Sequence, residues 1–356
     1  EQRIDQANDE RLEQLLENLS GELDTAIETP ERWLILVNEI AEARLRAINS
    51  SDENLRESYR QIEDDLNTQF QDFLDQKYSD LFSLSGIRRP VVVSKILDNI
   101  NARKEAKAAL IVLDGMNYWQ WLVISGNLRD SGIRFHAKGT MSYIPSITAW
   151  SRQSIFRGAE PDLNENNSKE AELFTKYWEG KGVNPRNILF RKFGVSENVP
   201  TSEIADTIKV LGLVCNDLDE IMHGTTMGDA QLLRSTLQWV DEIGIAEIIR
   251  ALQVKGFKIF IATDHGNLEA KGTGSLKGRD KISSVSRGKR FIDFPNETLQ
   301  RSFLEQNQGL NVGVNGLSVY LRDRSAFTIA DDKVITHGGS HIFEVLIPYI
   351  EIENNE

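Results

Sequence analysis

Aspartate and histidine side chains follow the ends of two apolar segments in this sequence. The segment "FKIFIAT" leads into Asp264 and His265, and "LIVL" leads into Asp114 and a glycine. An aspartate beside a histidine fills a hydrophobic core poorly, whereas a carboxylate and an imidazole together bind metal ions well. Taken alone, an Asp-Gly pair is more often a turn, so a metal site requires further ligands elsewhere in the chain.

Two further segments supply such ligands. In "NDLDEIMHG", Asp219 and His223 are four residues apart and would share one face of a helix. In "VITHGG", His337 stands where an apolar stretch meets glycines. These positions take three of the five histidines. We interpret the other two, His136 and His341, as ordinary polar residues or as hydrogen-bond donors behind the ligands.

The combined set consists of three carboxylates and three imidazoles and contains no thiolate. Oxygen and nitrogen ligands of this kind suit zinc or manganese and are poor ligands for an iron–sulfur cluster. They are too many for one tetrahedral ion, but they fit two ions roughly 4 Å apart, which can stabilise the attacking and leaving oxygens of a phosphoryl transfer. We therefore predict two divalent metal ions, with zinc favoured and manganese as the alternative.

The segment "SYIPSITAWSRQSIFRG" offers hydroxyl groups for such a site. Ser146 and Thr148 stand where a predicted strand gives way to a helix. A hydroxyl at the start of a helix lies beside unpaired N–H groups and the positive end of the helix dipole, which favour a bound phosphate. The alternative interpretation is a simple helix cap, and only the neighbouring metal ligands favour the catalytic one.

The segments that carry these residues alternate between strand and helix patterns from Ala108 onward. Continuous apolar runs indicate buried strands, and helical stretches such as "YWQWLVISGNLRDSG" separate them. This alternation predicts an α/β fold with a mostly parallel sheet sandwiched by helices, and ligands at the carboxyl ends of the strands. The predicted strands are "AALIVLD", "IRFHAKGTMSYI", "NILFRK", "VLGLVCN", "FKIFIATD" and "EVLIPYIEI".

The sequence before this region predicts helices and almost no strand. Leucines recur at helical spacing in "RLEQLLENLSGEL", and Thr29 and Pro30 are a typical start for a second helix. We predict two domains, a helical bundle over residues 1–106 and an α/β catalytic domain over residues 107–356. The charged faces of the bundle are typical of solvated surface, and the alternative is a module that docks a partner protein.

Composition and charge exclude several other classes of protein. The chain is 40% hydrophobic, as in a globular protein, and has no apolar run near the roughly 20 residues that span a bilayer. The single Cys215 excludes an internal disulfide and suits the cytoplasm, where we expect the protein to act. A net charge of −13 argues against nucleic-acid binding over the whole surface but leaves room for a local basic patch. The chain starts with Glu1 rather than methionine, as expected of a piece of a longer protein.

The order of the motifs resembles the alkaline phosphatase superfamily. That order is Asp-Gly at 114–115, Pro-Ser-x-Thr ending at Thr148, Asp-x-x-x-His from Asp219 to His223, Asp-His-Gly at 264–266, and a late His-Gly at 337–338. The late stretch "THGGSHIFEVLIPYI", together with "NDLD", most resembles the PglZ domain, which occurs in the BREX phage-defence systems of bacteria and archaea. The resemblance covers residues 108–353 and none of the helical front end.

The resemblance implies a metal-dependent phosphodiesterase, and a nuclease is one enzyme of that class. Thr148 would attack phosphorus, and water would then release the resulting phosphothreonine. Arg152 and Gln153, one turn into the same helix, are candidates by position for binding phosphate oxygens. Relatives often carry a small residue where this chain has Met222. By the resemblance, one metal ion would be held by Asp114, Thr148, Asp264 and His265, and the other by Asp219, His223 and His337.

A run of positively charged residues follows the Asp-His pair. It is rich in glycine and serine, and such a flexible basic strip next to a metal centre would attract an extended polyanion such as an oligonucleotide. We expect Lys289 and Arg290 to contact this substrate. The alternative is a solvated loop that balances an acidic protein. The seven cations of the strip are Lys271, Lys277, Arg279, Lys281, Arg287, Lys289 and Arg290.

Two other functions remain open from the sequence. The same scaffold could carry a phosphomonoesterase, whereas a sulfatase is disfavoured because Thr148 replaces the cysteine or serine that becomes formylglycine. Alternatively, the domain binds metal but acts mainly by recruiting partners, with the helical region contacting other phage-defence proteins. We expect no membrane partner.

Overall fold

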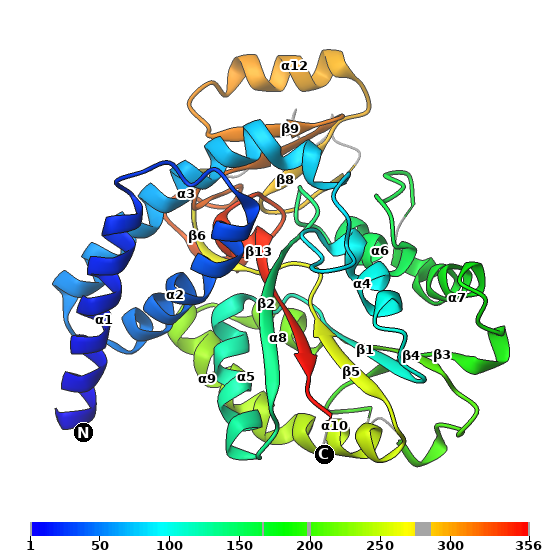
Figure 1. Cartoon of the computed structure of the whole chain (residues 1–356). Coiled ribbons are helices and arrows are strands. Elements are labelled where there is room, and N and C mark those ends of the chain that lie inside the picture. The colour runs from blue at the N-terminus through cyan, green and yellow to red at the C-terminus, as the bar shows by residue number, and fades with distance from the viewer. Residues whose placement is uncertain (1, 166, 198–200, 275–285, 355–356) are drawn as a thin grey trace.

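A computed structural model describes residues 2–165, 167–197, 201–274 and 286–354 of the chain. Its centre is a six-stranded sheet in the order β2-β13-β5-β1-β4-β3 (Figure 1). Strands β5, β1, β4 and β3 run parallel, and β13 pairs antiparallel with both β2 and β5. The strands are β1 Ala108–Leu113, β2 Phe135–Met141, β3 Ile188–Phe193, β4 Val210–Cys215, β5 Lys258–Ala262 and β13 Leu346–Ile352.

The central strands are buried on both faces, which explains their continuous apolar sequences. Along β1, Ala109, Ile111 and Leu113 pack into one hydrophobic cluster, and the alternating residues Leu110 and Val112 pack into another on the opposite face. The six predicted strands are the six strands of this sheet, so the predicted mostly parallel architecture is confirmed. Cys215 is buried at the end of β4.

Helices cover both faces of the sheet. Residues of α5, α9 and α10 belong to the cluster on one face, and residues of α4, α6 and α7 belong to the cluster on the other. Helices α9 and α10 are separated by Gly244, which has a φ of 63°. The bounds are α4 Ile96–Ala102, α5 Tyr118–Asp130, α6 Thr148–Arg157, α7 Glu170–Gly180, α9 Asp229–Ile243 and α10 Ile245–Val254.

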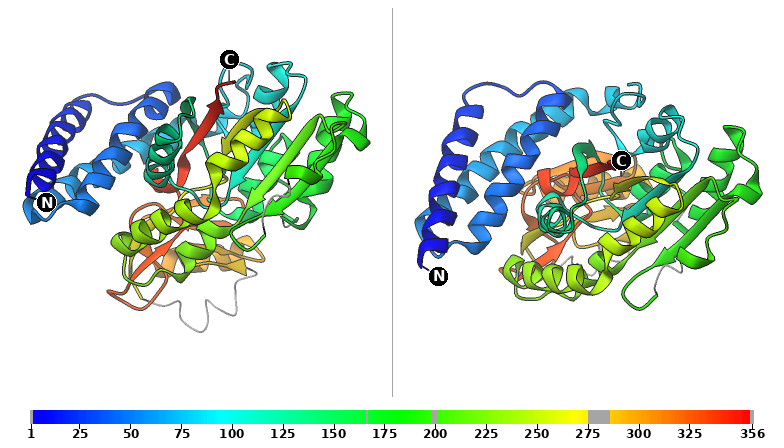
Figure 2. Two further views of the ribbon diagram at one scale, coloured as in Figure 1. Left: turned by 90° about the horizontal axis from the view of Figure 1, so that it is seen from below. Right: turned by 60° about the horizontal axis from the view of Figure 1, so that its bottom comes forward.

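Three helices precede the sheet: α1 Gln2–Glu22, α2 Pro30–Asn49 and α3 Glu53–Leu81. Thr29 caps α2 as predicted, because its hydroxyl accepts a hydrogen bond from the backbone N–H of Arg32. Asp52 caps α3 in the same way. Both views of Figure 2 place these helices along one side of the sheet domain, where α2 packs against α5 and β2. Their buried side chains join the same hydrophobic cluster as one face of the sheet.

Two small sheets lie between β5 and β13, in a region whose sequence predicts no strand. They are a three-stranded sheet, β11-β6-β12, and a four-stranded sheet, β7-β8-β10-β9. Helix α12 covers the second sheet at the top of Figure 1. These elements are β6 Leu268–Gly272, β7 Ser286–Arg287, β8 Phe291–Asp293, α12 Glu297–Gln306, β9 Val312–Asn315, β10 Ser318–Leu321, β11 Ser325–Ala326 and β12 Lys333–Thr336.

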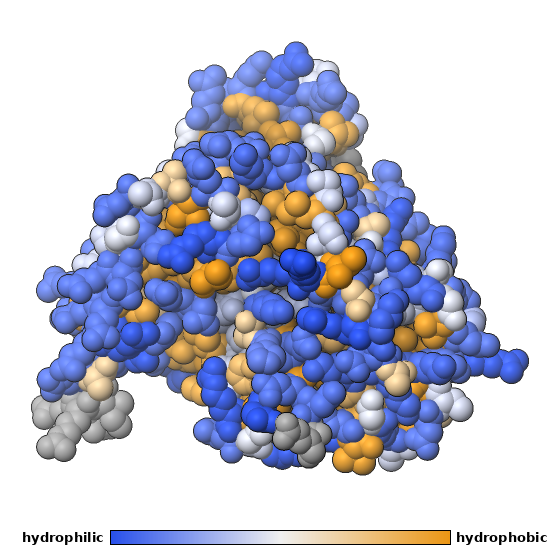
Figure 3. Space-filling view, viewed as in Figure 1, coloured by the Kyte–Doolittle hydropathy of each residue, from blue (hydrophilic) through white to orange (hydrophobic). Residues whose placement is uncertain are grey.

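Short helices complete the chain. Helix α8 follows β4 directly, and α13 precedes β13. The face shown in Figure 3 is mostly hydrophilic, and no described helix is long and apolar enough to cross a membrane. The short helices are α8 Asp217–Gly224 and α13 Ile342–Val345, with 3₁₀ turns at Val93–Lys95, Asn167–Lys169, Pro185–Asn187 and Thr201–Glu203.

Candidate metal centre

The predicted ligands meet at the carboxyl ends of the central strands. Asp114 follows β1, and Asp264 and His265 follow β5, its parallel neighbour. Gly115 has a φ of 70°, and a Cβ added there would lie 3.0 Å from Asp219 Oδ1, so glycine allows that carboxylate to approach. Asp219 itself lies on α8, directly after β4. The structure therefore brings together residues that lie far apart in the sequence.

The first ligand group consists of Asp114, Asp264 and His265, all buried, with one donor atom from each within 4.8 Å of the others. The His265 Nε2 atom lies 3.6 Å from Asp114 Oδ1 and 3.8 Å from Asp264 Oδ2. Thr148 Oγ1 lies 2.9 Å from the same Nε2 atom. Thr148 is the first residue of α6 and its hydroxyl faces the ligands, so the helix-cap interpretation is wrong: no side-chain cap bond is found at this helix start.

The second ligand group consists of Asp219, His223 and His337. The Nε2 atom of His337 lies 3.6 Å from Asp219 Oδ1, and that of His223 lies 3.4 Å from Asp219 Oδ2. The His223 side chain is 51% exposed, so this group opens to solvent while the first is enclosed. The rings of His265 and His337 stack with their centroids 3.8 Å apart, which makes the two groups direct neighbours.

Backbone carbonyl groups fix the orientation of two histidine rings. His265 Nδ1 lies 3.0 Å from the carbonyl oxygen of Gly266, and His337 Nδ1 lies 2.8 Å from that of Ser146. A carbonyl oxygen only accepts hydrogen bonds, so each Nδ1 carries the proton and donates it. Each Nε2 then carries the lone pair of its ring and lies on the side of the carboxylates, as in metal-binding histidines.

The electrostatics of the centre favour a bound cation. Asp114 Oδ1, Asp219 Oδ1 and Asp264 Oδ2 are buried without a hydrogen-bond partner. Burial and the neighbouring Asp264 raise the pKa of Asp114 well above its usual value. Burial and the neighbouring His265 lower the pKa of His337 to about 3, so this ring is neutral near pH 7. Unpaired buried acceptors of this kind fit divalent metal ions.

The chain that forms this centre is similar to one known protein family. The family model of the BREX system PglZ alkaline phosphatase-like domain matches residues 92–352. The chain belongs to the PglZ family. Membership of an alkaline phosphatase-like family supports a hydrolase that acts on phosphate esters and uses divalent metal ions. No curated protein sequence matches the chain.

Solved structures give weaker similarities. Murine ectonucleotide pyrophosphatase/phosphodiesterase 5 is 12% identical, with a TM-score of 0.49 and coverage of 69% of this chain and 88% of that one. Phosphonoacetate hydrolase from Sinorhizobium meliloti 1021, in complex with phosphonoformate, is 11% identical, with a TM-score of 0.45 and coverage of 69% and 90%. Similarities this low carry no information about the activity of this PglZ domain.

Arg152 of the PglZ domain lies behind the first ligand group. Its side chain is almost completely buried, and its Nη1 donates to Asp114 Oδ2 at 2.5 Å and to Asn216 Oδ1 at 2.8 Å. Its Nε pairs with Glu170. Asn216 follows β4 directly, but nothing in the sequence signals the contribution of Glu170, which lies 18 residues beyond Arg152. The guanidinium thus fixes one oxygen of Asp114 and leaves the other directed at His265.

Gln153 faces away from the ligands. Its amide bonds to the backbone of Asp162 and Glu165, so it supports the following loop. The remaining histidines are also separate from the ligand groups. His136 Nε2 lies 3.2 Å from Glu353, and His341 is buried at the start of α13.

The prediction for one residue of the basic strip, Arg290, is corrected by the structure. Arg290 is fully buried, and its Nε and Nη2 each lie 2.9 Å from a carboxylate oxygen of Glu344. The expectation that Arg290 contacts a substrate is therefore wrong, because its donors are used inside the fold. Lys289 is exposed. The hydrogen bond to Asp219 raises the pKa of His223, and the positive charge of Lys289 lies close enough to oppose that rise.

The rest of the strip is described only in part. Lys271 lies 2.7 Å from Asp331 in an exposed ion pair. Lys277, Arg279, Lys281 and the side chain of Arg287 lie outside the described residues.

Proposed function

We propose that this PglZ domain is a two-metal phosphodiesterase with Thr148 as its nucleophile. The observation that carries the proposal is the 2.9 Å separation between Thr148 Oγ1 and His265 Nε2, beside two groups of buried carboxylates and imidazoles. Family membership supports the coarser reaction class, a hydrolase of phosphate esters.

The residues that would hold the metal ions fall into two sets. Zinc is favoured because the ligands are oxygen and nitrogen atoms in small groups, with manganese as the alternative. Bound there, the ions would lower the pKa of the attacking oxygens and stabilise charge on the phosphoryl group. The first set is Asp114, Thr148, Asp264 and His265, and the second is Asp219, His223 and His337.

Thr148 supplies the bond-forming atom. Its Oγ1 attacks phosphorus, the bond from phosphorus to the leaving oxygen breaks, and the leaving group departs as an alcohol. A water molecule then attacks the phosphothreonine, which releases the second product as a phosphate monoester and restores the hydroxyl. Thr148 is the first residue of α6, so unpaired N–H groups of the first helical turn lie near the phosphoryl oxygens.

The substrate class that we propose is an oligonucleotide or another extended phosphodiester. Two features support it: the second ligand group opens to solvent at His223, and the exposed Lys289 adds a positive charge beside it. A long anion could contact this charge while one of its phosphates lies at Thr148. A phosphomonoesterase would need no such extended contact.

The direct test is hydrolysis of chromogenic phosphate esters by the purified protein. We expect a diester to be cleaved with zinc or manganese and not with a chelator, and a monoester to be cleaved more slowly. Faster cleavage of the monoester would support a phosphomonoesterase instead. No cleavage of either ester by the metal-loaded protein would favour a domain that acts by recruiting partners.

We also propose that the helical region binds another phage-defence protein. The outward face of α1 is charged and exposed, as at Glu13 and Glu17, while its inner face is packed on the rest of the chain. Reversing both charges to lysine should abolish co-purification with that partner and leave diester cleavage unchanged. Unchanged co-purification would remove this face from the interface.

A further inference from the structure

The loop that carries His337, the metal loop, has little backbone stiffness of its own. It runs through "HGGSHI" between β12 and α13. Gly338 has a φ of 111°, and a Cβ added at Gly339 would lie 2.2 Å from the carbonyl oxygen of Leu321. Glycine is therefore required at both positions, and two adjacent glycines leave the position of His337 to the surrounding contacts.

Residues of the PglZ domain hold one side of this loop. Ser146 donates from its backbone N–H to the carbonyl of Gly339 at 3.1 Å, and its Oγ accepts from the N–H of Gly338 at 3.1 Å. Glu344 accepts from the N–H of Gly339 at 2.8 Å and from the N–H of His341 at 2.9 Å. The buried ion pair with Arg290 holds that carboxylate in place.

Helix α3, outside the residues matched by the family model, holds the other side. Gln71 Nε2 donates to the carbonyl of Ser340 at 2.8 Å, and Ser340 Oγ donates to Gln71 Oε1 at 2.7 Å. One turn earlier, Asn67 Oδ1 accepts from the N–H of Ile342 at 3.0 Å. Both amides are 5% exposed, so water cannot readily replace these bonds.

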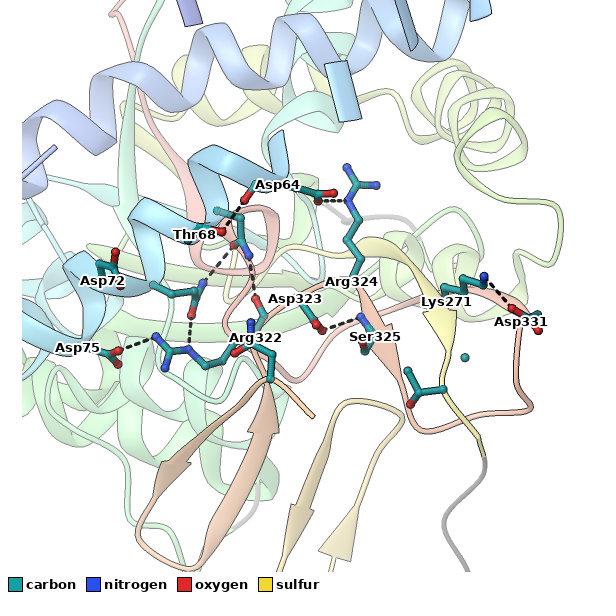
Figure 4. A pocket seen from close by; sticks show the side chains of 15 residues that line it. Asp64, Thr68, Asp72, Asp75, Lys271, Arg322, Asp323, Arg324, Ser325 and Asp331 are labelled. Carbon is teal, nitrogen blue, oxygen red and sulfur yellow. Dashed lines mark hydrogen bonds and ion pairs between the residues drawn. The ribbon is translucent and has the colours of Figure 1, made fainter. Parts of the chain in front are cut away.

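The two amides are fixed from behind as well. Gln71 Nε2 also donates to Asn67 Oδ1 at 3.1 Å, and Arg322 Nε donates to Gln71 Oε1 at 3.1 Å. These residues line a cavity of about 610 Å³ between α3 and the segment around Arg322–Ser325. Figure 4 shows Arg322 reaching Asp75 across it. No metal-ligand candidate lines this cavity, so the amides separate it from the metal loop.

We propose that Gln71 and Asn67 are positioning residues that place His337 for the second metal ion. This inference rests on the proposed metal centre. It means that α3 supplies residues that position a ligand of that centre. The bonds to Ser340 and Ile342 fix the far end of the loop, three and five residues beyond His337, while Ser146 fixes its near end. The first ligand group follows β1 and β5, and the hydrogen bonds of the two amides in the described structure go to other residues.

The test substitutes Gln71→Met, which keeps the volume of the side chain and removes its hydrogen bonds. Gln69→Met is the matched control, because Gln69 lies on the same helix and donates to the backbone carbonyl of Leu23 at 3.1 Å, away from the metal loop. Zinc binding is measured by competition with a chromophoric chelator. We expect Gln71→Met to weaken the second zinc by roughly 10-fold, the lower end of the effect of losing a direct partner of a metal ligand, because Gln71 acts on His337 through Ser340, and Gln69→Met to leave both affinities unchanged.

A variant that lacks His337 identifies which of the two zinc ions is affected. His337→Ala should retain one zinc, and adding Gln71→Met to it should not change the affinity of that remaining ion. In the metal-free protein, Gln71→Met should also speed hydrogen exchange of the backbone amides from Gly338 to Ile342, by roughly tenfold or more, while Gln69→Met should not.

The possible results separate this inference from the proposed function. A wild-type chain that binds no zinc or manganese overturns both. A wild-type chain that binds two ions, together with a Gln71→Met variant of unchanged affinities, overturns only the positioning role. Equal losses in the Gln71 and Gln69 variants would mean that α3 acts through general stability, which also overturns it.

Discussion

Oγ1 of Thr148 and Nε2 of His265 lie 2.9 Å apart, although the two residues are 117 positions apart in the sequence. Because His265 Nδ1 donates to the Gly266 carbonyl, Nε2 must accept, and the threonine hydroxyl donates its proton to it. The hydroxyl thus lies beside the lone pair that a metal ion would bind in place of the hydrogen bond. This relationship places the Thr148 hydroxyl beside the first ligand group, as the proposed role of Thr148 as nucleophile requires.

Removing the hydroxyl should therefore stop turnover. Thr148→Ala is expected to lower diester cleavage by roughly 10⁴-fold or more, as loss of the nucleophile can do in an enzyme with a covalent intermediate. Thr148→Ser should retain a measurable part of the activity, because it keeps the oxygen. Zinc content and thermal melting check that both variants remain folded and loaded. An alanine variant of unchanged activity would mean that water attacks phosphorus directly.

Metal removal should abolish activity and lower stability together. Elemental analysis should give up to two zinc or manganese ions per chain, and Asp264→Ala should lose at least one. An ion present at 100 times its dissociation constant stabilises the folded state by about 2.7 kcal/mol, so chelation should lower the melting temperature. Asp206→Ala, at an exposed position, is the control. Full activity in metal-free protein would contradict the two-metal mechanism.

The sheet and the ligands were predictable from sequence because one feature determines both. Strands buried on both faces must be apolar throughout, so their ends are visible as the points where Asp114 and Asp264 interrupt the pattern. Parallel neighbours place those ends at one edge. The short strands between β5 and β13 have two to five residues and carry no such signal.

Other site residues could not be predicted, because their partners are remote. Arg290 stands in a run of cations of which Lys271 and Lys289 are exposed, and only Glu344, 54 residues away, accounts for its burial. The hydrogen bonds that α3 makes to the loop of His337 have a weak signal in the sequence of that helix. Glu63, Asn67 and Gln71 recur every four residues and are all buried, so they form a polar stripe on the inner face of a helix. Such a stripe indicates bonds to a partner but does not identify it.

Lys289 and Arg290 should respond differently to substitution. Lys289→Glu should weaken binding of an oligonucleotide more than cleavage of a small diester, since only the long anion reaches this charge. Each lost phosphate contact should also flatten the log–log salt dependence of binding by about 0.9 for a duplex and about 0.7 for a single strand. Lys209→Glu is the control, because Lys209 is exposed at the opposite end of β4. Equal losses on both substrates would mean that Lys289 supports the metal centre instead.

Arg290 should act on stability. Arg290→Met leaves Glu344 buried without its partner, and breaking a buried ion pair costs about 3–5 kcal/mol. We expect a large fall in the free energy of unfolding by urea. The salt dependence of oligonucleotide binding by the folded fraction should not change. A stable variant with a flattened salt dependence would mean that Arg290 contacts the oligonucleotide.

His341 should make the folded protein sensitive to acid. Its ring is fully buried, its Nδ1 accepts from the N–H of Phe343 at 3.3 Å, and its Nε2 lies 3.6 Å from Glu63. Burial, followed by the positive charges of Arg324, Arg290 and Arg44, lowers its pKa well below the usual value.

The sign of the pH dependence follows from that lowered pKa. Above about pH 6.5 the ring is neutral in both the folded and the unfolded chain. Below about pH 6.5, the unfolded chain takes up a proton that folded His341 does not, so stability falls by about 1.4 kcal/mol per pH unit.

His341→Asn keeps an acceptor for the Phe343 N–H and cannot be protonated. In urea unfolding of metal-free protein, we therefore expect the variant to lose less stability than the wild type between pH 6 and pH 5, by about 1.4 kcal/mol. The other histidines are present in both proteins, so parallel curves would show that His341 accepts a proton in the folded state at its ordinary pKa.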